Sequence, residues 1–308
     1  MLPPHRSLAA ASTLFVIAIL SCSPDSTSPT TSTASSDASA ADRSSGSSVG
    51  FQHQPTGFTT LTVNTANVFP PFSGGWYSSL PGAWKMNQSS TATLISDASA
   101  PCSPPTAWSA TYRAGLAAGS GPITLWGQSG ATVKESRKWY VRACIKVGNA
   151  GGYENQSWGT KMWFGTVGDS PSAPRCSIIP VIKGDGKQAV KSSWTAMTTF
   201  ECGGVLPTVN FYQIPSAGRP IKSDTWQVHE WLIDAGDIDQ KNGRFQWWID
   251  GVLVIDKQGQ KFRTAASGRT HGLSVWRWTP TWGGMNGVRT RTDYYKIDDV
   301  YVSAWGTP

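Results

Sequence analysis

The sequence is poor in charged residues and in the repeating pattern of an amphipathic helix. Only 15% of its 308 residues are Asp, Glu, Lys or Arg, whereas 32 are Gly and 20 are Pro. Such frequent helix breakers, with little Ala, Glu, Lys and Leu periodicity, exclude a coiled coil and a mainly helical protein. After residue 22 no apolar run is long enough to cross a membrane as a helix. The composition favours a chain of short strands and turns.

The first 22 residues predict an export signal that does not belong to the fold. His5 and Arg6 precede an apolar run over residues 8–20, which has the length of a signal-peptide core. The run ends in Ile-Leu-Ser-Cys22, which resembles a bacterial lipobox, and an ordinary cleavage site nearby is the alternative. We expect an exported bacterial lipoprotein on the outer membrane or extracellular surface, held to the membrane only by a lipid at Cys22. Without the lipid it would be secreted.

Residues 23–50 are rich in Ser and Thr and contain no aromatic residue. This composition predicts a disordered linker, followed by one folded domain over residues 51–308. Setting Cys22 aside leaves four cysteines, and four cysteines in an exported domain predict two disulfides with three possible pairings. We favour Cys102 with Cys144 and Cys176 with Cys202.

The folded part alternates short β-rich runs with turn signals, which predicts an all-β, antiparallel β-sandwich. The pair Asp250-Gly251, between two apolar runs, predicts a tight hairpin. The expected strands are residues 59–63, 91–95, 107–113, 138–147, 160–166, 177–181, 210–214, 225–234, 243–250, 252–257 and 294–303.

Four motifs in the C-terminal third resemble the concanavalin A-like jelly roll. They are WQVHEW at residues 226–231, FQWWIDG at 245–251, PTWGG at 280–284 and KIDDVYVS at 296–303. The resemblance implies a jelly roll with one concave sheet that forms a groove, the fold of lectins, glucanases and several polysaccharide lyases.

Charge and aromatic content indicate the class of partner. The chain carries a formal net charge of +7 and contains 16 Trp. A basic surface favours anionic partners, and indole rings stack on the apolar faces of sugars. Export argues against nucleic acid, so we expect the partner to be an acidic polysaccharide. We also expect the protein to be a monomer.

Strand alternation nominates the site residues. In residues 225–234 one face carries Gln227, His229 and Trp231, and we expect this face to line the groove. The opposite face, with Trp226, Val228 and Leu232 beside Glu230, is expected to face the core. The run Gln227-Val228-His229 is similar to the Gln-Ile/Val-His signature of jelly-roll alginate lyases.

A second strand, residues 138–147, has one continuous apolar face. Its opposite face carries Lys138, Tyr140, Arg142, Cys144 and Lys146, and we expect this row in the same groove. Together with Trp231 and Trp248, the two lysines Lys138 and Lys146 are the expected substrate-binding residues.

The resemblance implies a polysaccharide lyase of the alginate or glucuronan type, which cleaves uronate linkages by β-elimination. This reaction needs a donor that neutralises the sugar carboxylate, a base at C5 and an acid for the leaving oxygen. Gln227 and Arg142 take the first role and His229 the second. Tyr140 takes the third, with Tyr294 and Tyr295 as alternatives and His271 as a reserve base.

Other functions fit the sequence less well than a lyase. A non-catalytic carbohydrate-binding module of the same fold is the main alternative. Hydrolysis is disfavoured because the chain lacks the Glu-x-Asp-x-x-Glu strand of the jelly-roll glucanases. No cofactor and no catalytic metal are expected, although the loop of residues 237–243 has oxygen ligands for a structural calcium ion.

Overall fold

The computed structural model describes residues 51–64, 76–77, 91–102, 105–121, 125–128, 136–167, 176–202, 212–265, 270–283 and 287–306. The expected signal peptide and linker, residues 1–50, lie outside them. The described residues belong to one compact unit, Arg43–Pro308. No helix in this part of the chain is long and apolar enough to cross a membrane.

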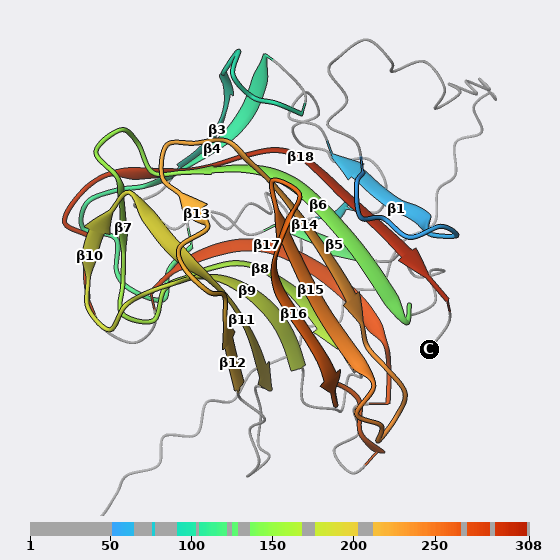
Figure 1. The fold of residues 1–308 in the computed structure, drawn as a ribbon. Helices are drawn as coiled ribbons and strands as arrows, with labels where there is room; N and C mark the ends of the chain where they lie inside the picture. Colours follow the sequence, from blue (N-terminus) through green and yellow to red (C-terminus); the bar gives the residue numbers. More distant parts are fainter. Residues whose placement is uncertain are drawn as a thin grey trace, which may run out of the picture. The chain divides into compact units, whose positions relative to one another are not determined.

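The protein is an antiparallel β-sandwich (Figure 1). The first sheet, sheet A, has the strand order β16-β15-β14-β6-β18-β4-β3, with β1 paired to β18. Its strands are β1 (Thr59–Asn64), β3 (Thr91–Ser96), β4 (Thr106–Tyr112), β6 (Lys138–Val147), β14 (Gln227–Asp234), β15 (Gly243–Ile249), β16 (Val252–Gln260) and β18 (Asp293–Trp305).

The second sheet, sheet B, has the strand order β12-β11-β9-β8-β17-β5-β2, with β13 paired to β11. A separate pair of short strands joins β7 and β10. The bounds are β2 (Trp76–Tyr77), β5 (Leu125–Gln128), β7 (Tyr153–Asn155), β8 (Thr160–Val167), β9 (Cys176–Lys183), β10 (Ala189–Lys191), β11 (Ser193–Cys202), β12 (Tyr212–Pro215), β13 (Ile221–Lys222) and β17 (Leu273–Trp282).

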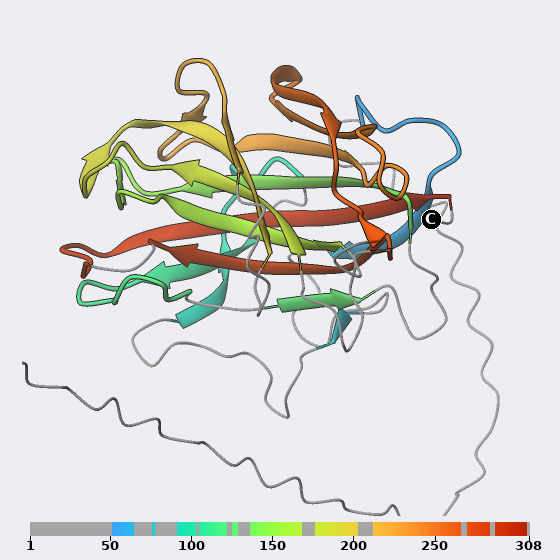
Figure 2. The same ribbon diagram turned by 90° about the horizontal axis from the view of Figure 1, so that it is seen from below.

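Both sheets curve in the same sense, and sheet B lies on the inner side of the curve (Figure 1). Strands of the two sheets run in roughly the same direction, as a second view shows (Figure 2), which is typical of aligned sandwiches. The sandwich therefore has one concave sheet, as expected. However, the two strands expected to line its groove, β6 and β14, belong to sheet A, on the outer side of the curve.

The core between the sheets is built largely from aromatic rings. Trp231 of sheet A packs edge-to-face on Trp163 of sheet B, with ring centroids 5.4 Å apart. Trp108 of sheet A and Trp278 of sheet B stack 6.0 Å apart. Because each buried indole removes a large apolar area from water, these rings supply much of the driving force for joining the two sheets.

The predicted hairpin is confirmed. Asp250 and Gly251 both have positive φ, at 51° and 77°, as a two-residue hairpin turn with the right-handed strand twist requires. The two long strands β11 and β17 were not predicted. In β17, Pro280 falls within the strand, at the place where its pairing with β8 shifts register, so a bulge accommodates the missing N–H.

The cysteines follow the favoured pairing as far as the structure describes them. Cys102 and Cys144 form a disulfide that links the segment before β4 to the centre of β6. Cys176 is also disulfide-bonded, and it lies directly opposite Cys202 where β9 pairs with β11.

Candidate functional site

The predicted faces of β6 are confirmed. Trp139, Val141 and Ala143 lie in the core between the sheets, with the other apolar residues of their row. The row of Lys138, Tyr140, Arg142, Cys144 and Lys146 therefore lies on the outer face of sheet A.

The predicted faces of β14 are reversed. Trp231 and Ile233 belong to the hydrophobic core, and His229 lies beside Ala143 of the core face of β6. Glu230 lies opposite Arg142 in the same strand pair and so shares the outer face with it. The expected groove row of β14 thus points inward, and Trp231 does not reach a substrate.

Gln227 is buried, and its side-chain amide forms hydrogen bonds that link two turns to β14. Its carbonyl oxygen accepts a hydrogen bond of 2.7 Å from the backbone N–H of Lys222. Its amide nitrogen donates to the backbone oxygen of Pro220 at 3.0 Å and to Asp250 at 3.1 Å. These bonds offset the cost of burying a polar group, so Gln227 acts in the fold and does not neutralise a sugar carboxylate.

His229 is enclosed by aromatic rings and only 1% exposed. Its ring stacks on Trp231 at 5.5 Å, and its Nδ1 accepts a hydrogen bond of 3.2 Å from the indole N–H of Trp247. Burial lowers the pKa of His229 to about 3, because an apolar environment disfavours the charged imidazolium. The prediction that His229 is the general base is therefore wrong, because His229 is a neutral core residue.

The outer face of sheet A retains five of the expected residues. The Tyr140 hydroxyl donates to the carboxylate of Glu230, and burial followed by this bond raises the tyrosine pKa well above its usual value. Arg142 is 3.5 Å from Asp299 and contacts the Cys102 sulfur at 3.0 Å. Tyr140, Glu230 and Arg142 are nearly closed off from solvent.

The remaining candidates on this face are engaged by neighbours. Lys138 forms an ion pair of 3.1 Å with Asp234, and Lys146 one of 2.9 Å with Asp224. Trp248 is 8% exposed. Of the alternative catalytic residues, Tyr295 lies in the core and His271 lies just before β17.

In the loop of residues 237–243, which has oxygen ligands suited to calcium, these oxygen atoms bind neighbouring side chains. Asp237 accepts a hydrogen bond of 2.7 Å from the amide of Asn242 and pairs with Arg137 at 2.8 Å. Asp239 accepts one of 2.7 Å from Thr264 and pairs with Lys261 at 3.0 Å. Within the described ranges, no group of three or more His, Cys, Asp or Glu residues is placed to hold a metal ion.

A cavity of about 560 Å³ lies on the other side of the molecule, at one end of sheet B. Four separate segments form it: the β7–β8 loop, the end of β9 with the following turn, and strands β11 and β12. The lining residues are Ser157, Trp158, Lys183, Gly184, Asp185, Gly186, Met197 and Gln213.

Asn155 fixes the loop that carries Trp158. Its fully buried amide donates 2.8 Å to the backbone oxygen of Ile182 on β9, and its carbonyl accepts 2.9 Å from the Thr160 hydroxyl. Gly184 lets the turn after β9 pack closely against this loop, because a Cβ at Gly184 would lie 1.8 Å from the backbone oxygen of Gln156. Trp158 is therefore 52% exposed on an anchored loop, as a preformed binding platform requires.

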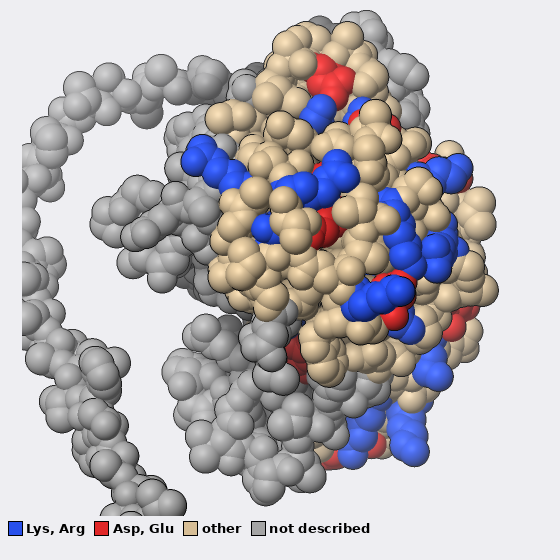
Figure 3. Space-filling view, turned by 90° about the vertical axis from the view of Figure 1, so that its left-hand side faces the viewer, with Lys and Arg blue, Asp and Glu red and all other residues tan. Residues whose placement is uncertain are grey.

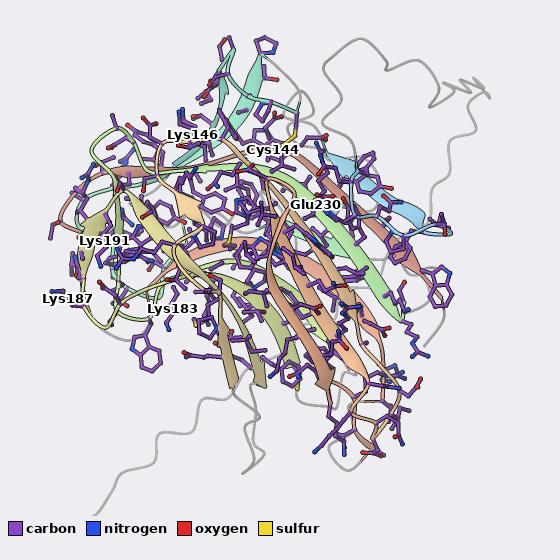
Figure 4. All side chains as sticks on the ribbon, in the orientation of Figure 1. Cys144, Lys146, Lys183, Lys187, Lys191 and Glu230 are labelled. Carbon is purple, nitrogen blue, oxygen red and sulfur yellow. A yellow bond between two sulfur atoms is a disulfide. The ribbon has the colours of Figure 1, made fainter. Side chains whose placement is uncertain are left out.

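Positive charge surrounds this end of the sandwich. Lys183 lines the cavity, and Lys187 and Lys191 lie on the same side of the molecule (Figure 4). Lys191 pairs with Asp185 and holds the pKa of that carboxyl below its usual value. Figure 3 views this end and shows more Lys and Arg than Asp and Glu over the described surface.

The outer face of sheet B carries a second cation, beside the apolar cluster of Ile179, Val181 and Met197. Lys161 on β8 lies 3.0 Å from Glu201 on β11, and its ammonium is 5.5 Å from the ring centroid of Phe164. Lys161 pairs with Val181 on β9, so Lys183 is its diagonal neighbour, about 7–8 Å away at the backbone.

The cavity residues were not among the predicted site residues. A signal was present: Trp158 stands alone between strands in the polar loop Asn155-Gln156-Ser157-Trp158-Gly159, where no strand face can bury it. Trp158, Lys183 and Gln213 are far apart in the sequence, so the sequence gives no sign that they line one cavity.

The fold and the cavity define an antiparallel β-sandwich with an aromatic-rimmed cavity on the outer face of its inner sheet. No protein-family profile and no curated protein sequence matches the chain. Among solved structures it is similar to an endo-β-1,4-glucuronan lyase from the fungus Trichoderma reesei, with 11% identity, a TM-score of 0.49, and 75% of this chain and 94% of that chain covered.

It is also similar to a marine alginate lyase from Aplysia kurodai, with 13% identity, a TM-score of 0.48, and 80% and 100% of the two chains covered. The catalytic domain of an endo-1,3-β-glucanase (laminarinase) from Thermotoga petrophila is similar with 10% identity and a TM-score of 0.45, and 80% of this chain and 97% of that chain are covered. At these identities and TM-scores the likenesses carry no conclusion about activity or substrate.

Proposed function

We propose that this protein binds an acidic, uronate-containing polysaccharide on the outer face of sheet B and cleaves it there by β-elimination. The observation that carries the proposal is the cavity, with the exposed indole of Trp158 at its rim and Lys183 in its wall. An aromatic platform next to a cation matches a sugar ring that bears a carboxylate.

Binding would begin with the sugar ring stacked on Trp158. The indole offers a flat apolar surface of low conformational freedom, and Gln213 and Ser157 offer hydrogen-bonding groups to the hydroxyls around the ring. The carboxylate of the same sugar would pair with Lys183.

A second cation extends the site along the sheet. Lys161, the diagonal neighbour of Lys183, would receive the carboxylate of a nearby sugar, because the two lysines share one face about 7–8 Å apart. Glu201 holds the Lys161 ammonium in place before the substrate arrives. Neutralising the carboxylate makes the adjacent C5 proton easier to remove. The Glu201 carboxylate, beside Lys161, would accept that proton, the C4–O bond would break as the C4–C5 double bond forms, and water would protonate the leaving oxygen.

The non-catalytic binding module is the second candidate, and one observation favours it. Among the described residues that line the cavity there is no His or Tyr, the side chains that most often exchange protons in such reactions. The two candidates share the substrate class and the site.

We further propose that the domain is exported, held outside the cell by a lipid at Cys22 and monomeric. Metabolic labelling with a radioactive fatty acid should mark the wild type and not Cys22→Ser. Light scattering on the chain without its signal should give the mass of one copy.

One experiment separates the two functional candidates. Purified protein is mixed with alginate, glucuronan and glycosaminoglycans, and the ultraviolet absorbance of the unsaturated uronate product is followed. A rise that is lost in Lys161→Met/Lys183→Met establishes the lyase. Binding on affinity gels without any rise establishes the module.

The matched control is Lys241→Met/Lys257→Met, which removes the same charge from exposed residues at and near β16. If both double variants weaken binding equally, the interaction is non-specific attraction to a basic protein and the proposed site is wrong.

A further inference from the structure

Residues 51–58, which we term the strap, lie across the outer face of sheet A and precede β1. Three contacts define their path. A Cβ on Gly57 would touch Trp305, the Phe51 ring packs at a tilt on Tyr301, and His53 contacts Glu230 and Trp248. The strap therefore crosses neighbouring strands and covers side chains that point away from the core.

Beneath the strap, four side chains form a straight row across sheet A. Trp248 on β15 lies opposite Glu230 on β14, Glu230 lies opposite Arg142 on β6, and Arg142 lies opposite Tyr301 on β18. Neighbouring strands are about 4.8 Å apart, so the row is about 14 Å long. Two aromatic rings stand at its ends and two opposite charges in its middle.

The strap contacts the row through two residues. The His53 ring lies parallel to the indole of Trp248, with an interplanar angle of 10° and centroids 4.5 Å apart. Its Nδ1 is 2.8 Å from the Glu230 carboxylate, which also accepts from the His53 backbone N–H at 3.1 Å. Phe51 is 4.4 Å from the Tyr301 ring and 5.2 Å from the Arg142 guanidinium.

The strap can leave without stranding a buried charge. With His53 gone, the Glu230 carboxylate keeps the hydrogen bond from Tyr140, keeps Arg142 beside it and gains contact with water. A buried charge is costly only while it lacks partners and solvent. The row is therefore a stable arrangement with or without its cover.

We propose that this row is a second glycan-binding site and that the strap is its tethered occupant. A pyranose ring takes the place of the His53 ring on Trp248, and the Glu230 carboxylate accepts from its hydroxyls. The Arg142 guanidinium binds a carboxylate or hydroxyl of the next sugar, and Tyr301 offers the second ring platform that Phe51 occupies.

This site is independent of the cavity on sheet B, because the row and the cavity lie on the outer faces of different sheets. A segment tethered next to its site acts as a ligand at an effective concentration on the order of millimolar. The strap therefore lowers the apparent affinity of the row for a glycan, because only molecules with an undocked strap can bind it.

The test uses Phe51→Ala/His53→Ala to release the strap, in the Trp158→Ala/Lys161→Met/Lys183→Met background, which removes the aromatic platform and both cations proposed for the cavity site. Binding of alginate and glucuronan oligosaccharides is measured by calorimetry. We expect the affinity to rise at least about ten-fold on release. Adding Trp248→Ala should remove the gain, and a synthetic peptide of residues 51–58 should compete with the sugar.

The matched control is Thr56→Ala, which alters an exposed strap residue and should leave the affinity unchanged. A variant that lacks residues 51–55 removes the cover outright. If that variant stays folded by circular dichroism and shows no gain in affinity, the proposal is overturned. A gain that Trp248→Ala does not remove also overturns it, because the sugar then binds elsewhere.

The result is separable from the proposed function. Failure of the cavity proposal appears as unchanged binding in Trp158→Ala with the strap docked. Failure of the present proposal appears only when the strap is released.

Discussion

Arg289 and Asp293 form an ion pair that is fully closed off from solvent. The guanidinium lies over three aromatic rings, with its Cζ 4.9 Å from the centroid of Tyr112, 5.2 Å from that of Tyr153 and 5.0 Å from that of Trp282. The pair fixes the segment before β18 against both sheets.

We predict that Arg289→Met lowers the free energy of unfolding by about 3–5 kcal/mol, because it leaves the Asp293 carboxylate buried without its main partner. Urea denaturation measures the loss. The control is Arg244→Met, which breaks the partly exposed pair with Asp256 and should cost less than about 1 kcal/mol. Equal losses in the two variants would contradict the prediction.

The burial of His229 predicts a specific dependence of stability on pH. Its pKa is about 3 in the folded protein and about 6.5 in an unfolded chain. Between these values the unfolded state binds a proton that the folded state does not, so the free energy of unfolding falls as the pH falls. The expected slope is about 1.4 kcal/mol for each pH unit.

His229→Gln should flatten this slope and keep an acceptor for the Trp247 indole N–H. The measurement is urea denaturation at neutral pH and at about pH 5, with His271→Gln as the control. If His229→Gln and the wild type lose the same stability on acidification, His229 does not carry the effect.

Trp158→Ala should weaken binding of the acidic polysaccharide by about ten-fold, which corresponds to about 1.4 kcal/mol. Stability should not change, because the side chain is 52% exposed. Trp305→Ala is the matched control, since this indole is 43% exposed on the other sheet. Affinity electrophoresis compares the two variants. A larger loss of binding in Trp305→Ala would contradict the prediction and indicate that the polysaccharide binds on sheet A.

Removing the Cys102–Cys144 disulfide by Cys102→Ala/Cys144→Ala should lower the free energy of unfolding by about 2–4 kcal/mol. The bond closes a loop with a sequence separation of 42, and its loss lets the unfolded chain expand. Denaturation of the oxidised wild type and the double variant measures the difference. An unchanged midpoint would show that the surrounding pairs, among them Arg142 with Asp299, hold this region alone.

The strands were predictable wherever one face is uniformly apolar. In β6 every second residue is apolar, so both its position and its inward face followed from the sequence. In β11, Thr195, Thr198 and Thr199 place hydroxyls on both faces and blur the alternation, which is why this long strand was missed. In β17 the proline concealed the strand.

The inward face of β14 was not predictable, because each of its faces mixes polar and large apolar residues. The core accepted Gln227 and His229 since neighbouring groups satisfy them: the Lys222 N–H and Pro220 oxygen for the amide, and the Trp247 indole for the imidazole. On the outer face, Glu230 meets Arg142 of the neighbouring strand. Only knowledge that β6 and β14 are neighbours reveals this complementarity.

The sequence by itself determined most strand positions, the Asp250-Gly251 hairpin and an all-β sandwich, since these depend on local conformation and on alternation along the chain. The tertiary structure decided which face of β14 points inward and which segments form a site. Alternation has a period of two and separates two faces without ranking them, and the cavity joins Trp158, Lys183, Met197 and Gln213 from segments that only folding brings together.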